Sequence, residues 1–166
     1  MKMQRKYGME WPIAPGEPEG GSQEAFDQFE NLLIYSSRQD ALAARSRLPA
    51  ARLPDAEPCE LLMVPSGAGL AMSDRFTDFG FIGARGHAYI ELAYTAVFRL
   101  IANTPEAEPA PAWMQLEEHR IAAIASEEGR EDMLAWQVIE RQLAELADRV
   151  ARAYRCTIEW LDTARL

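Results

Sequence analysis

Two short apolar runs with one helical pattern between them constrain the fold of this chain more than any other feature. Residues 32–35 (LLIY) and 59–64 (CELLMV) have the length and apolar content of buried strands. Residues 36–48 place alanines and leucines at helical spacing, and Pro49 ends this pattern. We therefore expect a strand, a helix and a second strand, with the two strands parallel and joined by a right-handed crossover.

The first of these strands has a competing interpretation. Ser22 could cap a short helix whose apolar face holds Phe26, Phe29 and Leu33 at intervals of 3 and 4. The compact run 32–35 ends in serines, as a strand before a helix does. We therefore favour the strand followed by the helix.

The second half of the chain shows mainly helical patterns. Apolar spacing predicts helices over 87–102, 113–125 and 127–153. In the last and longest helix, apolar residues recur at intervals of 3 and 4, as in a coiled-coil seam, so residues 133–153 could form a homodimer. Packing of this helix on the chain's own sheet fits equally well. Alternating residues near 79–81 and at 156–160 indicate two further short strands.

Together these patterns predict an α/β fold, with α+β as the alternative. We expect a small sheet of three to four strands with a βαβ start, covered by four helices of which the last is long. The length of 166 residues fits one domain. Residues 1–21, rich in proline and glycine, are expected to form an extended arm before a single domain at 22–166, and residues 103–112 a proline-rich linker before a helical C-terminal part.

Cysteine content and hydropathy limit the class of protein. No apolar run approaches the roughly 20 residues that a membrane span requires, and the basic start leads into no apolar signal core. Cys59 and Cys156 are far apart and outside any CxxC pattern, which favours neither a disulfide framework nor a structural zinc site. We therefore expect a cytoplasmic protein.

The net charge of −9 is concentrated in one segment. Between Thr104 and Asp132, eight acidic residues stand against two arginines, a local charge of −6. Such a field repels nucleic acid and anionic membranes and favours a basic protein partner, which could itself bind nucleic acid. A solvated face that serves solubility would also explain it. The residues expected to contact the partner are Glu117, Glu118, Glu127, Glu128, Glu131 and Asp132.

Residues 64–74 (VPSGAGLAMSD) raise the question of a phosphate-binding loop. A dinucleotide fingerprint needs a third glycine where Met72 stands, and a Walker loop needs a lysine that does not follow. A turn with positive φ is therefore favoured. If this loop at the sheet edge binds an anion or another small molecule, with or without turnover, the residues expected to do so are Ser66, Gly67, Gly69, Asp74, Arg85 and His87.

Catalytic and metal-binding patterns are weak. Ser66, His87 and Asp74 supply the residue types of a catalytic triad, but no nucleophile-elbow pattern surrounds Ser66. His87 and Glu91 would share a helix face near Asp74 and Asp78, but a single histidine with a carboxylate is common in helices. The sequence therefore predicts no catalytic residue, no metal and no cofactor.

Part of the chain resembles a known family. The stretch "LLIYSSRQDALAARSRL" followed by "CELLMVPSGAGLAM" has an apolar strand, a serine and Asp-Ala before a helix, a Val-Pro strand end and then glycines. Over residues 32–72 this succession resembles the selenium or sulfur carrier-like family. A cysteine carries the chalcogen in that family, and Ala68 holds the corresponding position here. The resemblance implies a version that has lost its thiol and kept a binding role.

These observations favour a non-catalytic binding or regulatory protein. We expect an acidic inhibitor, an immunity protein or an adaptor, of bacterial or phage origin, that engages a basic partner protein. The alternative is a small-molecule or anion-binding domain, with or without enzymatic activity, whose site is the loop at 64–87.

Overall fold

The computed structural model describes residues 2–11, 24–47, 57–125 and 135–166 of the chain. These residues form two compact units, each built on an antiparallel sheet. The barrel unit consists of Met3–Ser66, Gly80–Leu92 and Leu166, and the two-helix unit of Met1–Lys2, Gly67–Phe79 and Ala93–Arg165. The chain predicted as one domain from residue 22 onward is thus shared between two units.

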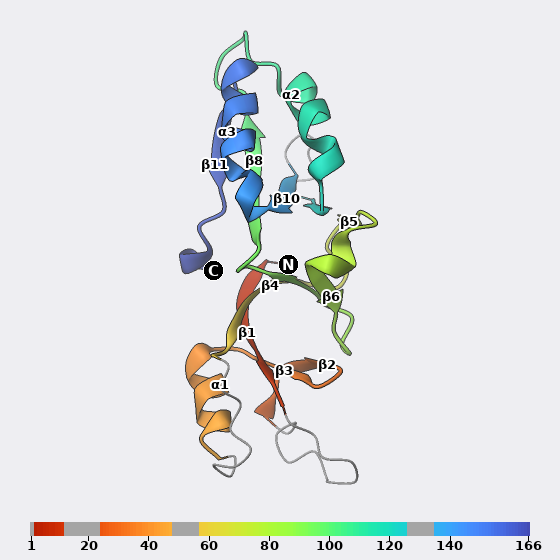
Figure 1. Ribbon diagram of the computed structural model, residues 1–166, viewed down its shortest axis with the longest axis vertical. Helices are drawn as coiled ribbons and strands as arrows, with labels where there is room; N and C mark the ends of the chain where they lie inside the picture. The colour runs from red at the N-terminus through yellow and green to blue at the C-terminus, as the bar shows by residue number, and fades with distance from the viewer. Residues whose placement is uncertain (1, 12–23, 48–56, 126–134) are drawn as a thin grey trace. The chain divides into compact units, whose positions relative to one another are not determined.

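The barrel unit contains a six-stranded antiparallel sheet and one helix (Figure 1). The strand order is β2-β3-β1-β4-β7-β6. The bounds are β1 (Gln4–Glu10), β2 (Asp27–Phe29), β3 (Leu32–Tyr35), α1 (Arg38–Arg45), β4 (Cys59–Val64), β6 (Gly80–Ile82) and β7 (Ala88–Glu91). Helix α1 begins after Ser37, whose Oγ accepts a hydrogen bond from the Asp40 N–H at 3.0 Å.

Strand β1 shows how the two faces of this sheet differ. Successive side chains of a strand point to opposite faces. Tyr7 and Met9 pack on the outer face, in a cluster with the buried alanines of α1. Lys6, Gly8 and Glu10 therefore face the interior, where the core cluster consists of Ile34, Leu61, Met63 and Tyr89.

The two edge strands, β2 and β6, approach each other so that the sheet nearly closes into a barrel. The Ala84 N–H donates to the Gln28 carbonyl at 2.8 Å. The rings of Phe29 and Phe81 stack with their centroids 4.5 Å apart. This near closure lets the sheet cover its own inner face and brings its two edges together.

Asp27, on β2, stabilises this closure through hydrogen bonds to β7 and to the turn between β6 and β7. Its Oδ1 accepts the backbone N–H of Arg85 at 3.0 Å, and its Oδ2 accepts the hydroxyl of Tyr89 at 2.9 Å. A Cβ atom at Gly83 would lie 2.5 Å from Oδ2, so the close approach requires glycine there. Burial and the hydrogen bond to Asp27 raise the pKa of Tyr89, which keeps its hydroxyl a donor at neutral pH.

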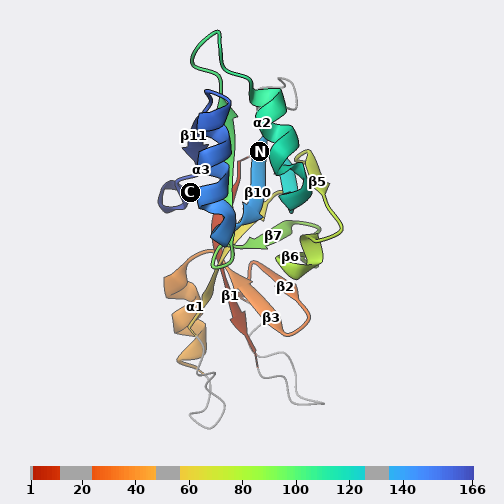
Figure 2. The same ribbon diagram turned by 45° about the horizontal axis from the view of Figure 1, so that its top comes forward.

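The two-helix unit contains a five-stranded antiparallel sheet with the order β11-β8-β10-β9-β5. Its bounds are β5 (Leu70–Met72), β8 (Thr95–Ile101), α2 (Pro109–Leu116), β9 (Ala122–Ile124), β10 (Trp136–Glu140), α3 (Ala144–Ala153) and β11 (Thr157–Trp160), with short 3₁₀ turns η3 (Phe76–Asp78), η4 (Glu117–His119), η6 (Arg141–Leu143) and η7 (Thr163–Arg165). Figure 2 shows α2 and α3 on the same side of the sheet. They enclose a core of Phe98, Leu100, Ala112, Leu116, Ile139, Ala147, Ala151 and Cys156.

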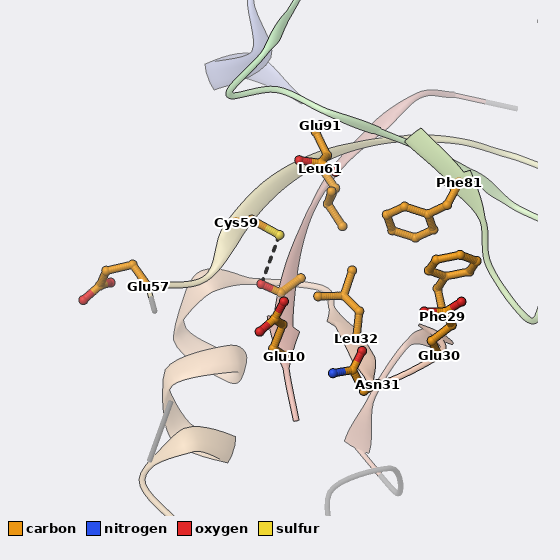
Figure 3. A pocket seen from close by; sticks show the side chains of 11 residues that line it. Glu10, Phe29, Glu30, Asn31, Leu32, Glu57, Cys59, Leu61, Phe81 and Glu91 are labelled. Carbon is orange, nitrogen blue, oxygen red and sulfur yellow. Dashed lines mark hydrogen bonds between the residues drawn. The ribbon is translucent and has the colours of Figure 1, made fainter. Parts of the chain in front are cut away.

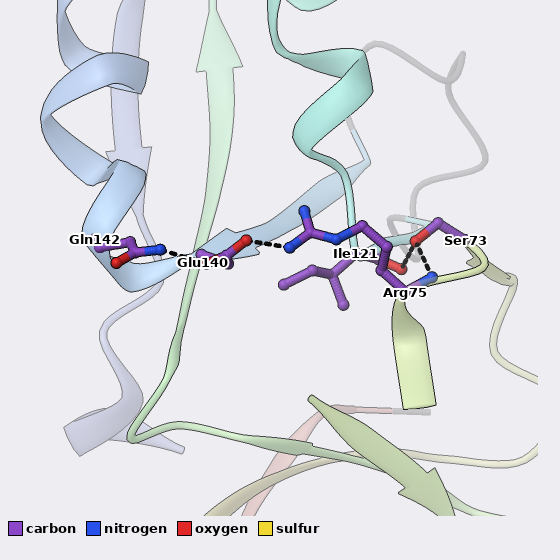
Figure 4. Close-up of polar contacts among 5 residues, drawn as sticks. All are labelled: Ser73, Arg75, Ile121, Glu140 and Gln142. Atoms are coloured by element: carbon purple, nitrogen blue, oxygen red, sulfur yellow. Dashed lines mark hydrogen bonds and ion pairs between the residues drawn. The ribbon is translucent and has the colours of Figure 1, made fainter. Parts of the chain in front are cut away.

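Polar contacts fasten the segment between β5 and η3 to this sheet (Figure 4). The Ser73 hydroxyl donates to the Ile121 carbonyl at 2.9 Å, and Arg75 forms an ion pair with Glu140. Gln142 donates to the same Glu140 carboxylate at 2.5 Å. The hydrogen bond from Arg75 holds the pKa of Glu140 below its usual range, so this carboxylate serves as a structural anion.

The predicted fold class, a small sheet of three to four strands under four helices, is wrong, and the α/β label does not fit. The part of the chain that the structure describes has two antiparallel sheets of six and five strands with three short α-helices. None of these helices is long and apolar enough to cross a membrane.

The βαβ start is the first point of difference. Strand β3, helix α1 and strand β4 lie where the sequence predicts them. Strand β1 lies between β3 and β4 and is antiparallel to both, so these two strands share a direction without pairing. The separating strand comes from the predicted arm of residues 1–21, of which residues 1 and 12–21 lie outside the described residues.

The predicted helix at 87–102 consists of two strands, β7 and β8. Ile90, Val97 and Phe98 fit helical spacing, but β-branched and aromatic residues dominate this segment and favour strands. The turn between the strands contains neither glycine nor proline, so the sequence marks no boundary there.

The two remaining helix predictions are also wrong in extent. Helix α2 starts at Pro109, inside the predicted linker at 103–112, because proline suits the first helical position. Residues 122–124, which were predicted to belong to the helix at 113–125, form strand β9. In the predicted helix at 127–153, Trp136 and Ile139 belong to β10, and only Ala144–Ala153 are α-helical. The predicted helix is therefore not continuous, and α3 packs on its own sheet, whereas the homodimer through 133–153 stays a prediction. The late strand is confirmed as β11.

Candidate functional site

The barrel unit contains a pocket with a volume of about 360 Å³ (Figure 3). It lies at one end of the interior, where β1 and β7 end, β4 begins and the β2–β3 hairpin turns. Its lining residues come from all six strands of the sheet and from their connections, so closure of the sheet creates it. A pocket of this volume falls within the range of small-molecule sites.

An apolar wall forms one side of the pocket. The rings of Phe29 and Phe81 lie face to face in Figure 3, with an interplanar angle of 20°. Leu32 and the fully buried Leu61 extend this wall toward β1. Phe29 is 36% exposed, so one face of the stacked pair is accessible from solvent.

All charged residues that line the pocket, within the described part of the chain, are glutamates: Glu10, Glu30, Glu57 and Glu91. Glu57 is bound to Arg38 with a distance of 2.5 Å between the guanidinium and the carboxylate. Burial raises the pKa of the half-buried Glu91. The pocket therefore has a negative electrostatic potential beside its apolar wall.

Gly8 and Cys59 form the inner end of the pocket. A Cβ atom at Gly8 would lie 2.7 Å from the Cys59 Sγ and 3.1 Å from Leu61, so only glycine fits between these side chains. The Cys59 thiol donates to the Gly8 carbonyl at 3.4 Å. Burial, reinforced by the charge of Glu91, raises the pKa of this thiol and keeps it protonated at neutral pH.

Glu30 has an unusual backbone conformation. Its φ of +49° lies in the left-handed region, which a residue with a long side chain rarely adopts. Such a conformation costs on the order of 1 kcal/mol and is often found at functional sites. The turn places Glu30 between the Phe29 ring and Asn31 at the pocket rim.

The predicted loop site is divided between the two units. Ser66, Arg85 and His87 belong to the barrel unit, and Gly67, Gly69 and Asp74 to the two-helix unit. Gly67 has a φ of +86°, which confirms the predicted turn. This loop does not contribute to the pocket at the barrel end.

The contacts of the loop residues in the barrel unit are structural. The Ser66 N–H donates to His87 Nδ1 at 3.0 Å, so the backbone of Ser66 and not its hydroxyl contacts the imidazole. His87 also stacks on Phe26, with ring centroids 5.8 Å apart, and the guanidinium of Arg85 lies 5.5 Å from the same ring. His87 immediately precedes the extended strand β7 and Glu91 is its last residue, so the two lie about 13 Å apart by strand geometry and cannot share a metal. No group of three or more potential metal ligands occurs among the described residues.

Of the residues predicted to bind a basic partner, the structure describes two. The side chains of Glu117 and Glu118 in η4 are 56% and 80% exposed. Glu117 lies 3.7 Å from Arg120, and Glu118 lies 3.4 Å from His119. Glu127, Glu128, Glu131 and Asp132 lie outside the described residues.

The sequence patterns predicted neither the pocket nor the buried Lys6, which precedes the pocket residues Gly8 and Glu10 on β1. Lys6 is 5% exposed, lies 4.0 Å from the centre of the Phe26 ring and is 3.3 Å from the Ser36 hydroxyl. Burial lowers its pKa. The alternation of Lys6, Gly8 and Glu10 with Tyr7 and Met9 was the available signal for a strand with a polar inner face.

Comparison with protein-family models, with curated proteins and with solved structures gives no match to this chain. The resemblance over residues 32–72 therefore stays a prediction, and the chemistry of the pocket is inferred from the chain's own residues.

Proposed function

We propose that this chain is a non-catalytic binding protein whose barrel unit holds a small molecule in the pocket at its end. The observation that carries this proposal is the pocket itself, with a volume of about 360 Å³ between an apolar wall and acidic side chains.

The residues of the pocket support binding rather than catalysis. The Cys59 thiol is the nucleophilic side chain in the described lining. Burial, reinforced by the charges of Glu91 and Glu10, raises its pKa, the opposite of what a reactive thiolate needs. Both cysteines are free, as expected for a protein of the reducing cytoplasm, which we propose as its location. The binding role also agrees with the one that the resemblance over residues 32–72 implies.

A fragment titration followed by amide NMR tests the proposal. We expect at least one fragment to shift the signals of Gly8, Cys59 and the β2–β3 hairpin selectively. The variant Cys59→Met should abolish these shifts by filling the pocket, and Met114→Leu, at a site 71% exposed in the two-helix unit, should leave them unchanged. A diverse library that shifts none of the pocket signals would overturn the proposal.

A second candidate function is the engagement of a basic partner protein, as the charge distribution predicts. The exposed side chains of Glu117 and Glu118 favour it, because together with the predicted residues up to Asp132 they would present negative charge to a partner. A basic protein captured at low salt should be lost in the double variant Glu117→Lys/Glu118→Lys. Equal capture by this variant would contradict a role for these two residues.

A further inference from the structure

The charge of the pocket selects among classes of ligand. In the described lining, no lysine, arginine or histidine accompanies the carboxylates. Glu10 and Glu30 form no ion pair with any residue that the structure describes, whereas Glu57 is already bound by Arg38. An anionic ligand would be repelled by these carboxylates, and a cationic ligand would be attracted.

The apolar wall indicates the rest of the ligand. Phe81 stacks between Phe29 and Tyr89, so the Phe29 ring presents the outer aromatic face of this stack, and Leu32 continues the wall (Figure 3). Aromatic faces bind flat apolar groups by stacking and also attract cations through the negative charge of their π-systems. A fully hydrated inorganic cation would gain little from this wall, so an organic cation fits better.

The size of the pocket limits the ligand further. A volume of about 360 Å³ has room for roughly a dozen water-sized groups. This fits one ring system with a short side chain. Polymers and large cofactors are too big to be enclosed.

We infer that the pocket binds a small organic cation, a protonated amine joined to a flat apolar group, with Glu10 and Glu30 accepting from the ammonium and Phe29 and Phe81 contacting the apolar part. This inference rests on the proposed function, because it names the ligand class of the same pocket. This role would explain why Glu30 has a left-handed φ of +49°. Glycine or asparagine would adopt this conformation with less strain, but neither would place a carboxylate at the pocket rim.

Three probes with one indole ring and different charge test the inference: tryptamine as the cation, 3-methylindole as the neutral analogue and indole-3-propionate as the anion. We expect tryptamine to bind at least about tenfold more tightly than 3-methylindole, as one charge-assisted hydrogen bond provides, and to shift the signals of Gly8 and Cys59. The anion should bind most weakly. The preference for tryptamine should decrease as salt is added.

Matched variants test whether the preference for the cationic probe depends on the carboxylates of Glu10 and Glu30. Glu10→Gln and Glu30→Gln should each weaken tryptamine about tenfold and leave 3-methylindole unchanged. Glu60→Gln is the control, because Glu60 lies on β4 between Cys59 and Leu61 but outside the pocket lining. Phe81→Leu should weaken tryptamine and 3-methylindole equally, which provides a second readout if a glutamate variant does not fold.

The outcomes separate the inference from the proposed function. Equal or tighter binding of 3-methylindole or indole-3-propionate at the pocket signals would overturn the organic cation and leave the pocket as a small-molecule site. Binding of tryptamine that Glu60→Gln weakens as much as Glu10→Gln would also overturn it. Failure of all three probes to shift the pocket signals would overturn the ligand class, and the fragment titration would then decide on the pocket itself.

Discussion

The two units cover their sheets in different ways. In the two-helix unit, α2 and α3 lie on one face of the five-stranded sheet and enclose an apolar core around Phe98 and Ile139. In the barrel unit, the six-stranded sheet covers its own inner face by closing, and short strands leave the end of the interior unfilled. A sheet sealed by helices gains stability from packing, and a sheet that closes on itself can retain a pocket.

The buried polar residues follow the same division. Among the described residues, the two buried charged side chains, Lys6 and Asp27, belong to the barrel unit, whereas the buried polar residues of the two-helix unit, Thr95 and Gln137, carry no charge. Burying a charge is costly unless other groups compensate it. The barrel unit therefore accepts a cost in stability that the two-helix unit avoids, as is common for units that bind ligands.

The largest difference is expected for truncation of one phenylalanine in each unit. Phe98 is fully buried, so Phe98→Ala should leave a cavity and cost about 4 kcal/mol of unfolding free energy. Phe29 is 36% exposed at the pocket rim, and Phe29→Ala should cost only about 1 kcal/mol. Urea unfolding of both variants measures the contrast. Equal costs would show that the barrel end is packed as tightly as the helix-covered core.

Breaking the closure of the barrel should have the next largest effect. Asp27→Ala leaves the Arg85 N–H and the Tyr89 hydroxyl without their acceptor and should cost about 3 kcal/mol. Amide hydrogen exchange should accelerate mainly in β2, β6 and β7. A uniform acceleration that includes β8 and β10 would contradict the view that Asp27 stabilises the barrel unit specifically.

A methyl group at the inner end of the pocket tests how closely Gly8 is packed. Gly8→Ala should cost about 2 kcal/mol because its Cβ would lie 2.7 Å from the Cys59 Sγ. The double variant Gly8→Ala/Cys59→Ala should recover most of this loss by removing the sulfur. Thermal unfolding of the single and double variants provides the measurement, and a double variant no more stable than Gly8→Ala would assign the clash to the backbone instead.

Among the residues that the structure describes, each unit contains one residue other than glycine with positive φ, Glu30 in the barrel unit and Arg155 after α3. Glu30→Gly and Arg155→Gly should each stabilise the protein by about 1 kcal/mol, because glycine adopts this conformation without strain. Only Glu30→Gly should weaken tryptamine binding. If both variants bind equally well, the strained turn serves no role in the pocket.

The smallest effect is expected at the buried cation. Burial lowers the pKa of Lys6, which means that burying the protonated ammonium lowers the free energy of unfolding at neutral pH. Lys6→Met should therefore be more stable than the natural chain at pH 7, by less than about 1 kcal/mol, since the contact with Phe26 offsets part of the cost. This advantage should shrink as the pH rises from the lowered pKa of Lys6 toward its ordinary value. A difference that does not change with pH would contradict this account.

The sequence predicted elements whose signal is local and missed those that depend on distant partners. Strands β3 and β4 and helix α1 were predictable because continuous apolar runs and the Ser37 cap mark them. The pair β7–β8 was not, because Ile90, Val97 and Phe98 satisfy both helix and strand spacing. The pocket could not be predicted, since Gly8, Phe29 and Cys59 come together only through closure of the barrel.

The division of the chain between the units has a consequence for its biosynthesis. All six strands of the barrel unit are complete once Glu91 has been added, so this unit can fold while the rest of the chain is still being made. Strand β5, which emerges before β6 and β7, pairs with β9 and must wait for Ala122–Ile124. The segment Gly67–Phe79 is therefore first a loop of the barrel, and it becomes part of the second sheet only after some fifty further residues have been translated.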